Sequence, residues 1–183
     1  MGKFIDFNSI VKTDWTKPSV QKNPLWIIAA LGAVLALVSV FVKWLTLKTT
    51  LTINGETNVT NLSTSALDNT EGIFVLVALV LVVYGLLYRQ WGVATLAGVI
   101  VFAFGCSYMV SAMAETATMV SKGETYTLAE LSKDLKNGVE YYRSMGCEVT
   151  HFTEVGGYGF MYAVVGGFLT TLCSFLLYKK SNK

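Results

Sequence analysis

The chain has 183 residues, of which 53% are hydrophobic and only 14% are charged. A soluble domain carries roughly 25% charged residues, so this composition excludes an ordinary soluble protein and indicates the lipid bilayer as a partner. The net charge of +2 provides no strong basic field, and we therefore expect no nucleic-acid partner.

Four apolar segments are long enough to cross the bilayer, because each helical residue adds about 1.5 Å toward a hydrocarbon core of roughly 30 Å. We expect transmembrane helices at residues 25–45, 72–88, 91–114 and 155–178, within one membrane domain of residues 1–183. The predicted fold is all-α transmembrane: a four-helix membrane bundle with a small extracellular β-hairpin and an outer amphipathic helix.

The charges predict the orientation of these spans. Lysine and arginine gather in short cytoplasmic segments near span ends. With the amino terminus inside, ten of the twelve acidic residues fall in the two outer loops, residues 46–71 and 115–154. We therefore expect a multi-pass protein of the cell membrane with cytoplasmic amino and carboxyl termini.

The segment before the first span, residues 1–24, has apolar residues at helical spacing, Phe4, Phe7, Val11 and Trp15. This pattern predicts an amphipathic helix on the inner membrane surface. A partly ordered tail that covers the bundle is the alternative.

The first outer loop contains Asn54-Gly55, a strong signal for a two-residue hairpin turn. A strict two-residue turn would place Leu51 and Ile53 on the opposite face from Val59. Asn58 and Asn61 each begin a glycosylation acceptor pattern, and the sequence leaves open whether either is modified.

The second outer loop has the signals of a helix. The run from Thr127 to Glu130 fits a capping box. An apolar stripe follows, made of Leu128, Leu131, Leu135, Val139 and Tyr142. We expect an outer amphipathic helix, interrupted or bent near Gly138, whose stripe packs on the hairpin, on the third span through Met119, or on another protein.

We predict no catalytic residue, cofactor or metal site. The span interiors contain no charged residue or histidine, the usual marks of an ion path, although a pore lined by Ser39, Ser107, Ser111 and Thr170 remains an alternative. Cys147, Glu148, His151 and Glu154 have ligand-like spacing, but the segment fits an extended strand at least as well.

Two further features are candidate interfaces. Gly159, Ala163 and Gly167 repeat every four residues, which lets helix backbones approach closely in lipid, within the chain or between copies. Cys147, the cysteine of the outer loops, can form an intermolecular disulfide if the compartment is oxidising, and the sequence leaves open whether it does.

The stretches FVKWLTL, EGIFVLVALVLVVYGLL and GGYGFMYAVVGGFLTTLCSFLLYKK resemble a loose group of small bacterial four-span membrane proteins of unestablished function. Its members share a Trp at the outer end of span one, and many have Pro before it where this chain has Lys43. The layout is similar to claudins in topology only, because the claudin Gly-Leu-Trp motif is absent.

From these features we expect a non-enzymatic integral membrane subunit or accessory protein. Its partners would be other membrane proteins or further copies of itself, bound through the outer loops and the small-residue helix faces. The interface candidates are Gly159, Ala163, Gly167, Leu128, Leu131, Leu135 and Cys147. An oligomeric channel or small-solute pore is the alternative.

Overall fold

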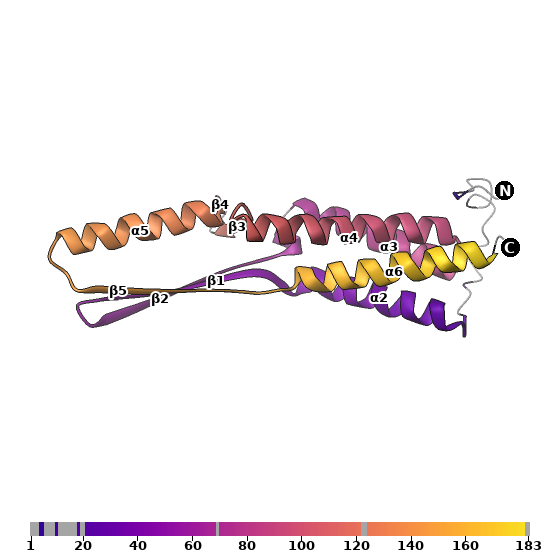
Figure 1. The fold of residues 1–183 in the computed structure, drawn as a ribbon, viewed down its shortest axis with the longest axis horizontal. Coiled ribbons are helices and arrows are strands. Elements are labelled where there is room, and N and C mark those ends of the chain that lie inside the picture. The colour runs from indigo at the N-terminus through magenta and orange to yellow at the C-terminus, as the bar shows by residue number, and fades with distance from the viewer. Residues whose placement is uncertain are drawn as a thin grey trace.

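The computed structural model describes residues 4–5, 10, 18, 21–68, 70–121 and 124–181. Most of the predicted inner amphipathic segment therefore lies outside the described residues. Figure 1 shows an elongated molecule with a helical bundle at one end and an extension of strands and one helix at the other.

The bundle consists of α2 (Pro24–Phe41), α3 (Thr70–Leu87), α4 (Trp91–Met113) and α6 (Phe160–Ser181). Among the described residues, α2, α4 and α6 are long and apolar enough to cross a membrane, whereas the apolar stretch of α3, Gly72–Leu87, is shorter. These three candidate spans indicate a membrane protein.

The start of α2 is encoded locally. The Asn23 side chain accepts a hydrogen bond from the backbone nitrogen of Leu25 at 3.0 Å, and Pro24 occupies the first helical position. The helix ends at Phe41, and the chain passes directly into a strand at Lys43.

Small residues bring α2 and α6 together. A Cβ atom placed on Gly166 would overlap the carbonyl oxygen of Gly32 and lie 2.6 Å from the backbone nitrogen of Ala36. The two backbones are therefore in direct contact, as small residues allow in a lipid environment.

The extension contains a three-stranded antiparallel sheet in the order β2-β1-β5. Its strands are β1 (Lys43–Ile53), β2 (Glu56–Ser65) and β5 (Val149–Gly156). Asn54 and Gly55 form the β1–β2 turn with φ angles of 50° and 88°, and Ile53 pairs with Glu56. This turn type is favoured by Asn-Gly, so the predicted hairpin is confirmed.

The connection from α4 back to β5 lies along one face of this sheet and covers part of it. A short hairpin of β3 (Thr118–Ser121) and β4 (Glu124–Thr127) leads into α5 (Leu128–Ser144), which runs alongside the sheet (Figure 1). The helix begins at the predicted capping box and continues through Gly138 without interruption. Its first residue joins the buried cluster of Leu45, Leu47, Ala117, Met119 and Leu128.

The prediction of an all-α fold, a four-helix membrane bundle, is wrong. The fold is mixed, with 63% helix, 22% strand and two antiparallel sheets. The end of the first expected span, from Lys43 onward, is the start of β1, and the start of the last expected span is the end of β5. Gly157 lies between β5 and α6 and has a φ of 79°. This left-handed conformation favours glycine and is incompatible with a right-handed helix, so the expected last span cannot begin before this residue.

We predict that Gly166→Ala lowers the free energy of unfolding by roughly 1 to 3 kcal/mol, because the new methyl group meets backbone atoms of α2 that cannot turn away. Thermal unfolding of the detergent-solubilised protein measures the effect.

Gly138→Ala is the matched control. A Cβ atom there meets nothing within 4 Å, and Ala stabilises a helix interior by about 0.5 to 1 kcal/mol relative to Gly. Equal melting temperatures for both variants would contradict the close crossing of α2 and α6.

Candidate functional site

The sheet joins the bundle at Trp44, the second residue of β1. Its side chain is only 2% exposed, and its indole nitrogen donates a hydrogen bond to the carbonyl oxygen of Ser39 at 2.6 Å. Its ring meets that of Tyr108 from α4 edge to face, with 4.9 Å between ring centres. The extension is thereby anchored in the bundle rather than tethered by a loop.

The predicted apolar stripe of α5 faces the sheet. Leu128, Leu131 and Leu135 line a cavity of about 290 Å³ together with His151 and Val155 of the sheet. Leu128 is buried, and the other two leucines are half-buried. The structure therefore brings these three candidates against their own chain. All three face the sheet, and Leu128 also packs with Met119, which lies in β3 and not on a continuation of α4.

The predicted small-residue stripe, Gly159 before α6 and Ala163 and Gly167 within it, is also in contact with its own chain. A Cβ atom on Gly159 would lie 2.7 Å from the carbonyl oxygen of Lys43, and one on Gly167 would lie 2.6 Å from the backbone nitrogen of Phe102. Ala163 is fully buried in the core between them. This stripe therefore packs α6 against its neighbours in the bundle.

Cys147 is half-buried in the turn that follows α5. The segment after it is β5, where His151 is opposite Leu51 and Glu154 is opposite Lys48. Because side chains alternate along a strand, His151 and Glu154 point to opposite faces. Within the described residues, no group of three His, Cys, Asp or Glu side chains could hold a metal ion.

The sheet has a second face, turned away from α5, on which two exposed apolar side chains flank the central strand. Thr50 of β1 is the partner of both Val59 in β2 and Phe152 in β5, so these three residues form one row across the sheet. Val59 is 51% exposed and Phe152 is 65% exposed. We call Val59, Thr50 and Phe152 the outer row.

The sequence indicates only part of the outer row. The Asn54-Gly55 turn fixes which residues of β1 and β2 share a face, so it places Thr50 beside Val59. In β5, side chains alternate between the two faces, but only once residues 149–156 are known to form a strand. Phe152 was missed because the register between β5 and β1 is not encoded locally.

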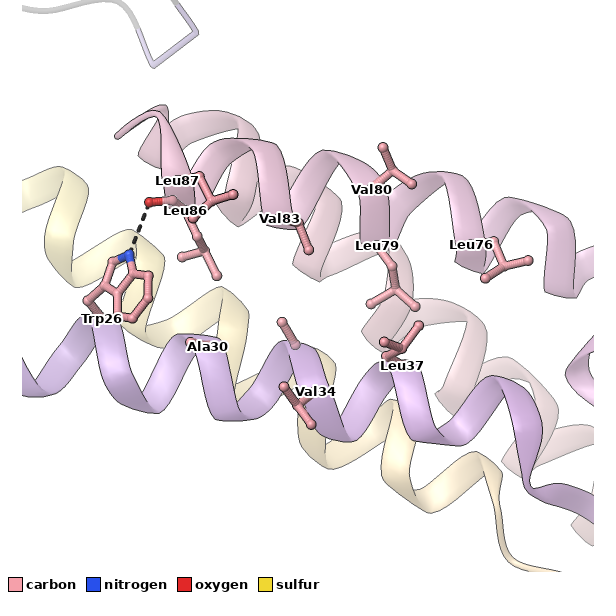
Figure 2. A pocket seen from close by; sticks show the side chains of 11 residues that line it. Trp26, Ala30, Val34, Leu37, Leu76, Leu79, Val80, Val83, Leu86 and Leu87 are labelled. Carbon is pink, nitrogen blue, oxygen red and sulfur yellow. Dashed lines mark hydrogen bonds between the residues drawn. The ribbon is translucent and has the colours of Figure 1, made fainter. Parts of the chain in front are cut away.

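The bundle contains a groove of about 390 Å³ between α2 and α3 (Figure 2). At one end the indole nitrogen of Trp26 donates a hydrogen bond to the carbonyl oxygen of Leu86 at 3.0 Å, which Figure 2 marks with a dashed line. All eleven lining residues are apolar, including Val34, Leu37 and Leu79. The groove suits hydrocarbon and has no polar side chain to select one ligand over another.

The hydroxyl groups considered for a pore lie in two separate places. Ser39 donates to the carbonyl oxygen of Ala36 and Thr170 to that of Ala29, both inside the bundle. Ser107 and Ser111 instead line a cavity of about 320 Å³ beside Trp44. The structure thus does not bring the four side chains together.

No known protein family matches this sequence, and neither does any curated protein.

We expect the contribution of the α5 capping box to stability to depend on pH. Hydrogen bonds from the backbone and hydroxyl of Thr127 hold the pKa of Glu130 below its usual value of 4.5. A carboxylate whose pKa is lowered by folding stabilises the protein above the unfolded pKa and loses this effect as the pH falls through the folded pKa.

The measurement compares the melting temperatures of wild type and Glu130→Gln across pH. Wild type should be the more stable protein near neutral pH. The difference should begin to shrink as the pH falls below about 4.5 and vanish once the pH is below the lowered pKa of the folded protein. Glu140→Gln, on the same helix outside the box, controls for the loss of one charge. A pH-independent difference would mean that the carboxylate charge is not involved.

Proposed function

We propose that this chain is a non-enzymatic membrane subunit that binds another membrane protein through the outer row of its sheet. The carrying observation is the pair of exposed apolar side chains, Val59 and Phe152, beside Thr50 on a sheet face that α5 does not cover. Aromatic side chains surrounded by polar residues are typical of the centre of a protein interface.

The position of the outer row supports a protein partner rather than lipid. Thr50 lies seven residues beyond Lys43, where β1 leaves the bundle. At about 3.3 Å per strand residue, this places the row roughly 23 Å from the start of β1, just beyond the end of α2. Acyl chains do not reach this distance beyond the hydrocarbon, so the exposed ring of Phe152 is not explained by burial in lipid.

The neighbours of the outer row indicate the kind of surface it fits. On the same face, Lys48 and Glu154 form the next row toward the membrane, and Thr52 with Thr57 forms a row on the far side. The complementary surface would have an apolar centre to cover Phe152 and a rim of polar groups of both charges.

We further propose that α3 is a fourth crossing and that both termini are cytoplasmic. An α-helix of 18 residues is about 27 Å long, close to the thickness of the hydrocarbon core. Lys179 and Lys180 in the last turn of α6, and Arg89 in the α3–α4 turn, lie at the helix ends away from the sheet. This excess of positive charge favours the cytoplasmic side for that end.

The first test is co-purification after cross-linking in native membranes, with the captured proteins identified. Phe152→Ser should reduce recovery of the specific partner by more than roughly tenfold, because losing an aromatic residue at the centre of an interface costs 2 kcal/mol or more. The melting temperature should stay unchanged, since the side chain is exposed.

Thr150→Ser is the matched control, on the same strand and face but outside the outer row. Unchanged recovery with a Val59→Ser and Phe152→Ser double variant would contradict the proposed surface. Saturable solute flux through the purified protein in liposomes would instead support the pore.

The orientation is tested with a membrane-impermeant thiol reagent on intact, mildly reduced cells. Wild type should be labelled and Cys147→Ser should not, because Cys147 lies in the outer extension. Ser181→Cys, introduced into the Cys147→Ser protein at the end of α6, should react only after permeabilisation. The reverse pattern would place the extension in the cytoplasm.

A further inference from the structure

Two adjoining hollows lie where the sheet leaves the bundle. The polar hollow, about 360 Å³, is lined by side chains that include Lys48, Asn61, Ser63 and Glu154. The interfacial hollow, about 590 Å³, is lined by residues that include Val42, Tyr158, Met161 and Tyr162. Lys43 and Thr46 line both hollows, so the two form one continuous depression.

The depression crosses the level at which the membrane ends. The interfacial hollow lies where α2 ends at Phe41 and α6 begins at Phe160. Its two tyrosines are exposed, as suits rings that prefer the membrane–water interface. The polar hollow lies beyond it, on the sheet face turned away from α5. The lining therefore changes from apolar near the helices to polar beside the sheet. A lipid molecule changes in the same direction, from its acyl chains to its headgroup.

The charge of the depression is positive. Lys48 lies directly opposite Glu154 in the β1–β5 ladder, so that one acid offsets one lysine. Lys43 is exposed, and its cross-strand partner in β2 is Ser65, whose backbone nitrogen and hydroxyl donate hydrogen bonds to the Asp68 carboxylate. Asp68 lines neither hollow. The two lysines and one glutamate that do line them give a net charge of +1, with Lys43 at the boundary between the two hollows.

We propose that the two hollows together bind one anionic phospholipid of the adjacent leaflet. The phosphate lies at the ammonium group of Lys43, since lysine binds phosphate as a compact point charge. The polar part of the headgroup meets Asn61 and Ser63, and an acyl chain runs along Val42 and Met161. This site requires only that α2 and α6 end at the membrane surface, and it does not depend on the proposed protein partner.

The test is a lipid titration of the purified full-length protein in detergent. Phosphatidylglycerol and phosphatidylcholine with identical acyl chains are added separately, and the melting temperature and the lipid retained in native mass spectrometry are measured. Phosphatidylglycerol should give a saturable rise in melting temperature and the greater retention. Equal effects of the two lipids in both measurements would overturn the proposal.

Lys43→Gln should weaken the apparent affinity for phosphatidylglycerol roughly fivefold, because one basic residue near an anionic lipid contributes about 1 kcal/mol. The side chain is exposed, so the variant should fold normally. Lys133→Gln on α5 removes the same charge away from the depression and is the matched control. Full phosphatidylglycerol selectivity in Lys43→Gln would overturn the assignment of Lys43.

Glycerol phosphate distinguishes a lipid from a free phosphate. It has the same charged group without acyl chains, and it should produce no shift at the concentrations at which phosphatidylglycerol saturates. An equal shift with glycerol phosphate would show a phosphate site without a lipid role, and would overturn the proposal in its lipid form.

Discussion

The structure depends on the burial of Trp44 between the bundle and the sheet. Its indole nitrogen donates a hydrogen bond to the carbonyl oxygen of Ser39 where α2 passes into β1, and its ring packs against Tyr108 of α4. On the other side, the backbone nitrogen of Gly159 donates to the carbonyl oxygen of Lys43 at 3.0 Å, and a Cβ atom on that glycine would lie 3.1 Å from the Trp44 ring. One side chain thus fixes α2, β1, α4 and the start of α6 relative to one another. Because β1 is the central strand, its direction sets the position of β2 and β5 and of every residue on the sheet face turned away from α5.

Features with a local physical cause were predictable from the sequence. Asn54-Gly55 supplied the positive φ angles of its turn, and the Thr127–Glu130 box supplied the start of α5. The class of the fold was not predictable in this way. The strand β5 pairs with a strand about one hundred residues earlier, as in Leu51 with His151, and local propensity does not encode such a pairing. The start of β1 was read as a helix end because Trp44 and Leu45 are apolar, and apolar character alone does not separate a buried strand from a buried helix.

The candidate sites were predictable to a smaller extent, for a related reason. A stripe such as Gly159, Ala163 and Gly167 has the same sequence pattern whether it meets its own chain or another copy. Its contacts with Lys43 and Phe102 are long-range geometry that the pattern does not contain. The leucines of α5 were correctly expected to need cover, and three possible covers were open until the sheet was placed. Phe152 was not predicted as a site residue because the sequence around it does not show which side chains it lies beside. Its place in a row with Val59 follows only from the pairing of both residues with Thr50.

The two proposed sites lie on the same face of the three-stranded sheet, so a ligand at one site would lie close to a ligand at the other. Thr46, Lys48 and Thr50 follow one another along that face of β1, from the hollows at the membrane surface to the outer row. The row of Lys48 and Glu154 lies between them, so a protein seated on Phe152 would reach the rim of the polar hollow. A lipid phosphate at Lys43 would then add negative charge beside that protein. Any change in partner affinity caused by the lipid must be matched by an equal change in lipid affinity caused by the partner, because the coupling free energy between two binding sites is reciprocal. Opposite charges on the partner and the lipid would make the coupling favourable, and a partner with an acidic rim would compete with the lipid for the same lysines.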